Sequence, residues 1–133
     1  MGSNIKIFDN DLPSNIDFSK EKVISADLEA LGLEIARDPL TLVQLGLQNK
    51  SCYIIKLNRK TYKAPNLCKV FSNTNTEFIF HYARQDLIWL KYYLRVEPKN
   101  IFCTKIGSKI ARTASPNHGY KDLVKELCGK EIS

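Results

Sequence analysis

Two apolar runs separated by a short polar turn constrain the fold of this chain more than any other feature. The runs cover residues 40–47 and 52–57, and Gln48-Asn49-Lys50 lies between them. Their lengths and their content of Leu, Ile and Val are typical of strands. Parallel strands need a much longer connection, so a turn of this length favours antiparallel pairing. The sequence therefore predicts an antiparallel meander in this part of the chain.

The segments around the meander alternate between strand-like and helix-like patterns. Short apolar runs predict strands at residues 5–8 and 23–26, before the meander. After it, helical periodicity alternates with short apolar runs, which predicts helices at 64–71, 83–94, 104–113 and 120–128 and strands at 77–81 and 100–103. Gly129 fits the C-terminal cap of the last helix. This order predicts a single α/β domain over residues 1–133, with a mixed sheet flanked by helices.

Composition excludes several classes of protein. The chain is 44% apolar, enough for a substantial core, and no apolar run approaches the ~20 residues that span a bilayer. Residues 1–8 lack a signal-peptide pattern, so we expect a cytoplasmic protein without a membrane partner. The four cysteines form no CxxC pair and lie far from both histidines. Buried, reduced thiols are therefore expected instead of a zinc site or disulfides.

The charge balance favours an anionic partner. The formal net charge is +6, and nucleic acid is the commonest partner of such proteins. From Lys99 onward, basic residues outnumber acidic ones. The candidates for contact with substrate phosphates in this part of the chain are Lys105, Lys109, Arg112 and Lys121. Solvated helix faces would give the same pattern.

Two carboxylates follow the predicted strand at residues 23–26. Asp27 and Glu29 are two residues apart, so on an extended chain they point to the same face. A divalent cation between them would offset their repulsion, because hard cations prefer oxygen ligands. The alternative is that both carboxylates are solvated at the end of the strand and bind no cation.

Asp86 supplies a third carboxylate from a different element. It precedes Leu90 by four residues and Leu94 by eight, which places it on the apolar stripe of the predicted helix 83–94. A carboxylate there costs several kcal/mol unless it is paired or bound to a cation. An N-capping role is the alternative so near the helix start. Three acidic groups from two elements suit a two-metal phosphoryl-transfer site, which usually needs one further carboxylate.

Five motifs resemble those of ribonuclease D-like 3′–5′ exonucleases of the DEDD superfamily, in the family order and spacing. The segment from Asp27 to Leu33 resembles DTExLGL, and Arg37-Asp38-Pro39-Leu40 with Val43-Gln44-Leu45 matches the stretch after it. The segment from His81 to Asp86 resembles HxARxD. The remaining two begin at Phe102, as in FCTKIAS, and at His118, as in HGLKDLV.

The resemblance implies a ribonuclease H-like fold and hydrolysis of RNA or other single-stranded nucleic acid from its 3′ end. It also implies two Mg²⁺ or Mn²⁺ ions, with Asp27, Glu29 and Asp86 at matching carboxylate positions. His81 would lie beside the site and contact substrate, although a lone histidine is more often a structural group.

Three departures from the family pattern stand out. Leu28 and Ala30 replace small hydroxyl residues, and Leu28 is expected to point away from the carboxylates. Gln85 replaces an aromatic residue before Asp86. The family pattern continues with a Ser-Asp-Trp segment and a Tyr-x-x-x-Asp helix, whereas this sequence ends at Ser133.

Three functions follow as alternatives. The chain is an exonuclease, a nucleic-acid binder without turnover, or a fragment that needs a complementing chain. Without the final helices of the family, we expect apolar groups such as Leu123 and Leu127 to stay partly exposed. Homo-oligomerisation or a partner, and low activity of the isolated chain, are the expected consequences.

Overall fold

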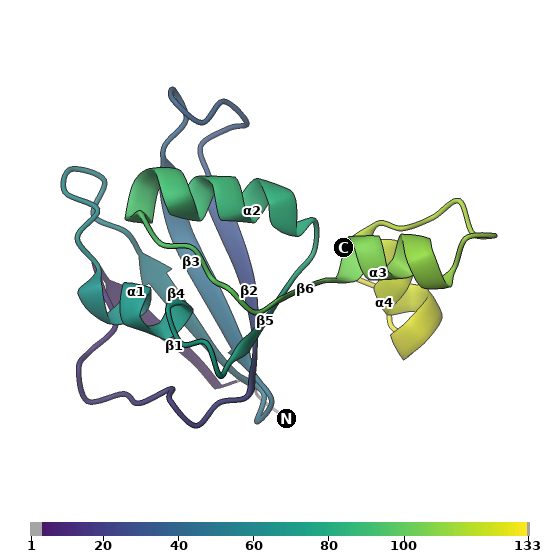
Figure 1. The fold of residues 1–133 in the computed structure, drawn as a ribbon, viewed down its shortest axis with the longest axis horizontal. Helices are drawn as coiled ribbons and strands as arrows, with labels where there is room; N and C mark the ends of the chain where they lie inside the picture. Colours follow the sequence, from purple (N-terminus) through teal and green to yellow (C-terminus); the bar gives the residue numbers. More distant parts are fainter. Residues whose placement is uncertain (1–3, 133) are drawn as a thin grey trace.

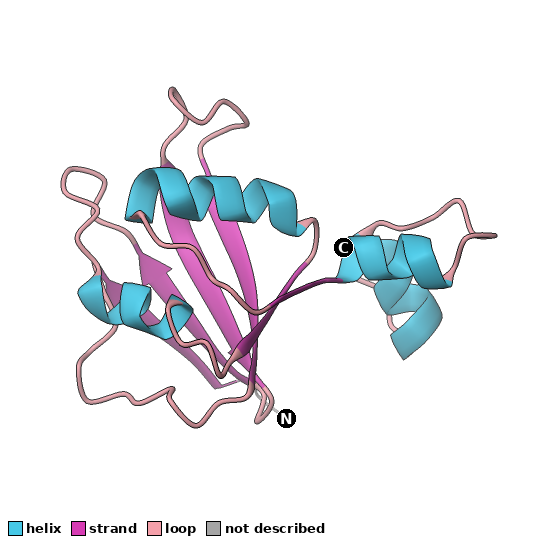
Figure 2. Ribbon diagram, viewed as in Figure 1, coloured by secondary structure: helices cyan, strands magenta, loops and turns pink. Residues whose placement is uncertain are grey.

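A six-stranded mixed sheet forms the centre of the computed structural model, which describes residues 4–132 (Figure 2). Its order is β1-β4-β3-β2-β5-β6. The strands are β1 (Asn4–Asp9), β2 (Val23–Ala30), β3 (Leu40–Leu47), β4 (Ser51–Lys56), β5 (Glu77–Phe80) and β6 (Ile101–Cys103). All of the predicted strands are present, and β2 continues to Ala30, beyond its predicted end at residue 26.

The predicted meander is confirmed by the pairing of the central strands. β2 and β3 run antiparallel, as do β3 and β4, with Val43 opposite Ile55 in the second pair. β5 pairs with β2 in parallel orientation, and β6 pairs with β5 in the same way. The sequence did not indicate the partner of β1, which pairs in parallel with β4, placing Ile7 opposite Ile54.

The helices follow the predicted order. They are α1 (Pro65–Phe71), α2 (Ala83–Trp89), the π-helical turn η1 (Leu90–Leu94), α3 (Thr104–Ala111) and α4 (Tyr120–Cys128). Pro65 lies in the first turn of α1, where its missing N–H costs nothing. The predicted helix 83–94 is α2 with η1, and Arg95 ends it in the left-handed conformation. Gly129 caps α4 with φ 65°, as predicted.

The helices α1 and α2 cover one face of the sheet (Figure 1). Leu67 and Phe71 of α1 are fully buried, and the Phe71 ring lies 5.3 Å from the ring of Phe78 in β5. Trp89 and Leu90 bring the end of α2 into the same core. Burying these side chains supplies the main stabilisation of the fold, at roughly 1.5–3 kcal/mol for each fully buried large apolar group.

The helices α3 and α4 form a lobe beyond the β6 edge of the sheet (Figure 1). They pack mainly on each other and on β6. Leu127 is 68% exposed, as expected, whereas the expected exposure of Leu123 is wrong because only 7% of this residue is exposed. Ile110 adds a further exposed apolar side chain to the lobe.

The state and burial of the four cysteines agree only in part with what the sequence predicts. All four cysteines are free thiols. The expectation that they are buried is wrong for Cys128, which is exposed, and Cys52, Cys68 and Cys103 are only half-buried. Among the described residues, no helix has the length and hydropathy needed to span a bilayer.

Candidate active site

Strand β2 presents Asp27 and Glu29 on its side away from the apolar core. Burial alternates along the strand, so that Ile24 and Ala26 are in the core while both carboxylates are exposed. The predicted shared face is therefore confirmed. Leu28 packs against the core, as expected from the same alternation.

Helix α2 brings Asp86 toward these two carboxylates. The burial of the Asp86 carboxyl, and then the charges of Asp27 and Glu29, raise the pKa of Asp86 to about 7. Tyr82 occupies the N-cap of α2, so Asp86 is not the capping residue. Glu29 and Asp86 line one cavity of about 210 Å³ together with Trp89.

The three carboxylates form a donor set that suits a hard divalent cation. Within residues 4–132, none of them forms an ion pair with a lysine or arginine, and no three metal-binding side chains stand close enough to hold an ion unaided. Magnesium keeps several water or phosphate ligands and takes only one or two carboxylates from a protein. The residues present therefore fit a magnesium-type site that water or substrate completes.

His81 follows β5 and lies next to Asp27. Both line a cavity of about 500 Å³, along with Thr104 and Tyr120. His81 Nδ1 is 2.9 Å from the Thr104 hydroxyl oxygen, and the His81 ring lies 5.7 Å from the Tyr120 ring. Burial and the nearby Lys105 ammonium lower the pKa of His81, against an opposing effect of Asp27. The two lowering effects favour the neutral form of the imidazole.

The predicted phosphate-binding residues have unequal positions. Lys105 stacks its ammonium over the Tyr82 ring, 4.3 Å from the centroid, and lies beside His81. Lys109 and Lys121 are exposed on the α3–α4 lobe. Of the predicted basic residues, the structure therefore places Lys105 near His81, while Arg112 has another set of partners.

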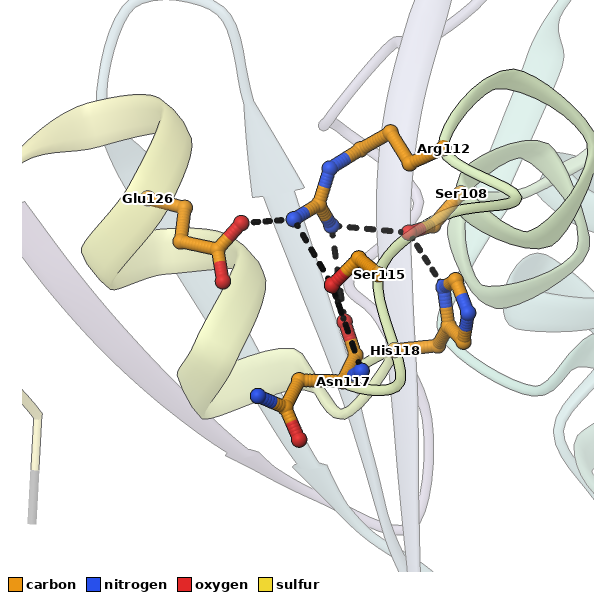
Figure 3. A network of polar contacts seen from close by, with 6 residues as sticks. All are labelled: Ser108, Arg112, Ser115, Asn117, His118 and Glu126. Atoms are coloured by element: carbon orange, nitrogen blue, oxygen red, sulfur yellow. Dashed lines mark hydrogen bonds and ion pairs between the residues drawn. The ribbon is translucent and has the colours of Figure 1, made fainter.

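Arg112 is the centre of a polar network inside the α3–α4 lobe (Figure 3). Its guanidinium pairs with Glu126 and donates to Ser108 Oγ at 3.0 Å. Ser108 Oγ also lies 2.8 Å from His118 Nδ1. Ser115 joins through a 3.4 Å contact with the guanidinium. The network holds the connection between α3 and α4 against both helices, which explains the burial of Ser108.

Asp38 shapes the loop that follows Glu29, a role that sequence reasoning did not assign. Its carboxylate accepts a hydrogen bond from the Glu34 amide at 3.0 Å and two from the Arg37 guanidinium at 2.8 Å. The Arg37 hydrogen bonds, and then the Glu34 amide, lower the pKa of Asp38 to about 2. Gly32 leaves room for this carboxylate, because a Cβ there would lie 2.2 Å from Asp38 Oδ2.

We expect Gly32→Ala to lower the free energy of unfolding by about 1–3 kcal/mol, as overpacking commonly does. The added methyl would force Asp38 out of its hydrogen bonds with Glu34 and Arg37. Urea unfolding followed by circular dichroism measures the change. Gly119→Ala is the matched control, because its Cβ would meet only the Asp122 carboxylate, at 3.0 Å. Equal stability of the Gly32 and Gly119 variants would contradict this account of the loop.

Comparisons with known proteins show the family and the fold of the chain. The family model described as 3′–5′ exonuclease matches residues 9–133. The structure of Brucella melitensis NrnC bound to pGG is 36% identical with a TM-score of 0.93, over 99% of this chain and 64% of that one. NrnC with bound Mg²⁺ is 37% identical with a TM-score of 0.92, over 98% and 64%. No curated protein sequence matches the chain.

Escherichia coli RNase D shares the fold at 17% identity, with a TM-score of 0.67 over 86% of this chain and 30% of that one. The chain thus spans less than two thirds of the length of the NrnC structures. The predicted α/β, ribonuclease H-like architecture and the ribonuclease D-like resemblance are both confirmed. With a family model matched along almost its whole length, the chain belongs to the 3′–5′ exonuclease family.

Proposed function

We propose that the chain is a metal-dependent exonuclease domain that removes nucleotides from the 3′ end of RNA or other single-stranded nucleic acid. The observation that carries the proposal is that Glu29 and Asp86 line one cavity and that Asp86, whose pKa is raised by burial and then by the charges of Asp27 and Glu29, lies within electrostatic reach of both. Such a carboxylate group beside open cavities suits cation-assisted phosphodiester hydrolysis. Family membership supports the same reaction class.

The proposed cofactor is Mg²⁺ or Mn²⁺, held by Asp27, Glu29 and Asp86. A bound pair of such ions supplies an attacking hydroxide and stabilises the leaving oxygen of the sugar. NrnC, the relative with 37% identity, was solved with Mg²⁺. His81 lines the same cavity as Asp27, Lys105 lies near His81, and both are proposed to contact substrate.

The proposed substrates include very short strands, since the relative with 36% identity was solved with pGG. A direct test uses a 5′-labelled RNA oligonucleotide with Mg²⁺ or Mn²⁺, in which a 3′–5′ exonuclease shortens the product one nucleotide at a time. Products that accumulate with chelator present, or in an Asp27→Asn variant, would argue against a carboxylate-bound metal. Complete absence of metal-dependent shortening would refute the proposal for the isolated chain.

A partner that completes the domain is the second candidate, as a homo-oligomer or a complementing chain. The exposed apolar side chains of Ile110 and Leu127 favour it, at 74% and 68% exposure. Light scattering tests this idea, because association would give a mass above the 15.2 kDa of one chain. A strict monomer with full activity would exclude the need for a partner.

We expect binding of single-stranded nucleic acid to weaken steeply with salt. Each phosphate contact releases condensed counterions, with a slope of about −0.7 per contact for single strands. A Lys105→Gln variant should lower this slope by roughly one contact. Lys130→Gln, near the end of α4, is the control. Fluorescence anisotropy between low and high salt measures the slopes. An affinity that does not change with salt would show that phosphate contacts do not contribute to binding.

A further inference from the structure

The hydrogen bonds of Thr104 select one tautomer of His81. The Thr104 hydroxyl oxygen lies 2.9 Å from His81 Nδ1 and 3.2 Å from the carbonyl oxygen of Phe80. A carbonyl oxygen only accepts, so the single hydroxyl proton is directed to Phe80. Nδ1 of His81 is then the donor to the hydroxyl. In the neutral ring, Nε2 is left without a proton and acts as an acceptor.

The other histidine of the chain has the opposite arrangement (Figure 3). The hydroxyl oxygen of Ser108 accepts from the Arg112 guanidinium at 3.0 Å, because a guanidinium only donates. The Ser108 proton is then available to His118 Nδ1, 2.8 Å away. The Ser108 hydroxyl can therefore donate to His118 Nδ1, which favours a proton on Nε2 of His118, and this ring serves as an internal reference for His81.

The free nitrogen of His81 lies where substrate is expected. The ring lines the same cavity as Asp27, and within the described residues Nε2 has no hydrogen-bond partner. An unprotonated nitrogen needs a donor. Phosphate oxygens of a nucleotide only accept, so the donors in the sugar–phosphate part of a 3′-terminal nucleotide are its sugar hydroxyls.

We propose that His81 Nε2 accepts a hydrogen bond from a sugar hydroxyl of the bound 3′-terminal nucleotide, and that Thr104 is the positioning residue that fixes this nitrogen as an acceptor. The proposal rests on the exonuclease function above. It assigns His81 a specificity role, because a nucleotide that lacks the hydroxyl leaves the nitrogen unpaired.

Nitrogen-15 NMR of the histidine rings tests the tautomers without any activity. At neutral pH we expect His81 to carry its proton on Nδ1 and His118 on Nε2. Thr104→Val should remove the preference at His81 and leave His118 unchanged, whereas Thr104→Ser should preserve both. A proton on Nε2 of His81 in the native chain would overturn the proposal, and so would a Thr104→Val spectrum identical to the native one.

Substrates with single hydroxyls removed test the recognition itself. We compare pGG with versions whose terminal sugar lacks either the 2′ or the 3′ hydroxyl. Removal of the hydroxyl that His81 recognises should lower kcat/KM and affinity about 10-fold, and removal of the other should not. Thr104→Val should abolish this difference, while Thr104→Ser should retain it. The compound with the lower kcat/KM therefore identifies the hydroxyl that binds His81.

The two proposals fail in different ways. Equal kcat/KM and equal affinity for all three compounds would overturn the role of His81 while leaving the exonuclease in place. No hydrolysis, with hydroxyl-dependent binding still measured by NMR titration, would refute the exonuclease activity of the isolated chain and support the role of His81. Loss of hydroxyl discrimination in Thr104→Ser would also overturn the positioning role.

Discussion

An Asp86→Asn variant is expected to unfold with a higher free energy than the native chain at pH 8 without divalent cations, by about 2 kcal/mol. A carboxyl pKa of about 7 instead of 3.8 corresponds to about 4 kcal/mol at full value, and solvent at this half-buried group reduces it by about half. Asparagine removes the charge and keeps the shape. Urea unfolding at pH 8 measures the gain.

The pH dependence has a definite sign. The folded chain holds the Asp86 proton more tightly than the unfolded chain, whose carboxyl titrates near 3.8. The stability from this proton is complete below about pH 4 and is lost as the pH rises through about 7. The native curve should fall across this window relative to that of Asp86→Asn, and the two should agree near pH 4.

Added divalent cation is expected to reverse the order of stability of the native chain and Asp86→Asn. Mg²⁺ that binds only the folded chain raises the stability of the native chain, and its effect on Asp86→Asn should be much smaller. Asp122→Asn, on the exposed side of α4, is the control and should show neither effect. If Asp86→Asn destabilises the chain equally at pH 4 and pH 8, the native Asp86 carboxylate has a favourable partner and is not destabilised by its neighbours.

Asp27→Asn and Glu29→Gln are each expected to slow metal-dependent hydrolysis by about 10²–10⁴-fold. Groups that act as one unit give non-additive losses. The double variant should therefore be little slower than the slower single variant. Single-turnover rates with Mn²⁺ provide the measurement, and Asp122→Asn is again the control.

A multiplicative loss in the double variant would contradict a shared metal site. Each carboxylate would then act independently, for example by binding separate parts of the substrate. Thermal unfolding of each variant beside the native chain, without divalent cations, separates a chemical loss from misfolding.

Local patterns in the sequence predicted most of the elements and the three carboxylates. Alternation along residues 23–30 placed Asp27 and Glu29 on one face, and helical spacing placed Asp86 toward the sheet. These predictions depend only on the periodicity of one strand and one helix. The same local reasoning predicted Gly129 as a cap, since few other residues adopt a positive φ without cost.

Contacts between distant segments could not be predicted in this way. Nothing in residues 4–9 indicates parallel pairing with β4, because any exposed apolar strand could fill that edge. The bond between His81 and Thr104 joins residues 23 positions apart, and it follows from the parallel pairing of β5 and β6. Asp38 was visible as part of a motif, but its contact with Gly32 depends on the path of the loop.

The lobe formed by α3 and α4 has a consequence for how the molecule opens. Its helices share few contacts with the main core, so their amide hydrogens should exchange with solvent through local opening, at a free energy below that of global unfolding. The tilted contact between the Tyr120 and His81 rings is one point where the lobe meets the cavity beside Asp27. Local opening of the lobe would therefore alter access to that cavity while the sheet and its two covering helices remain folded.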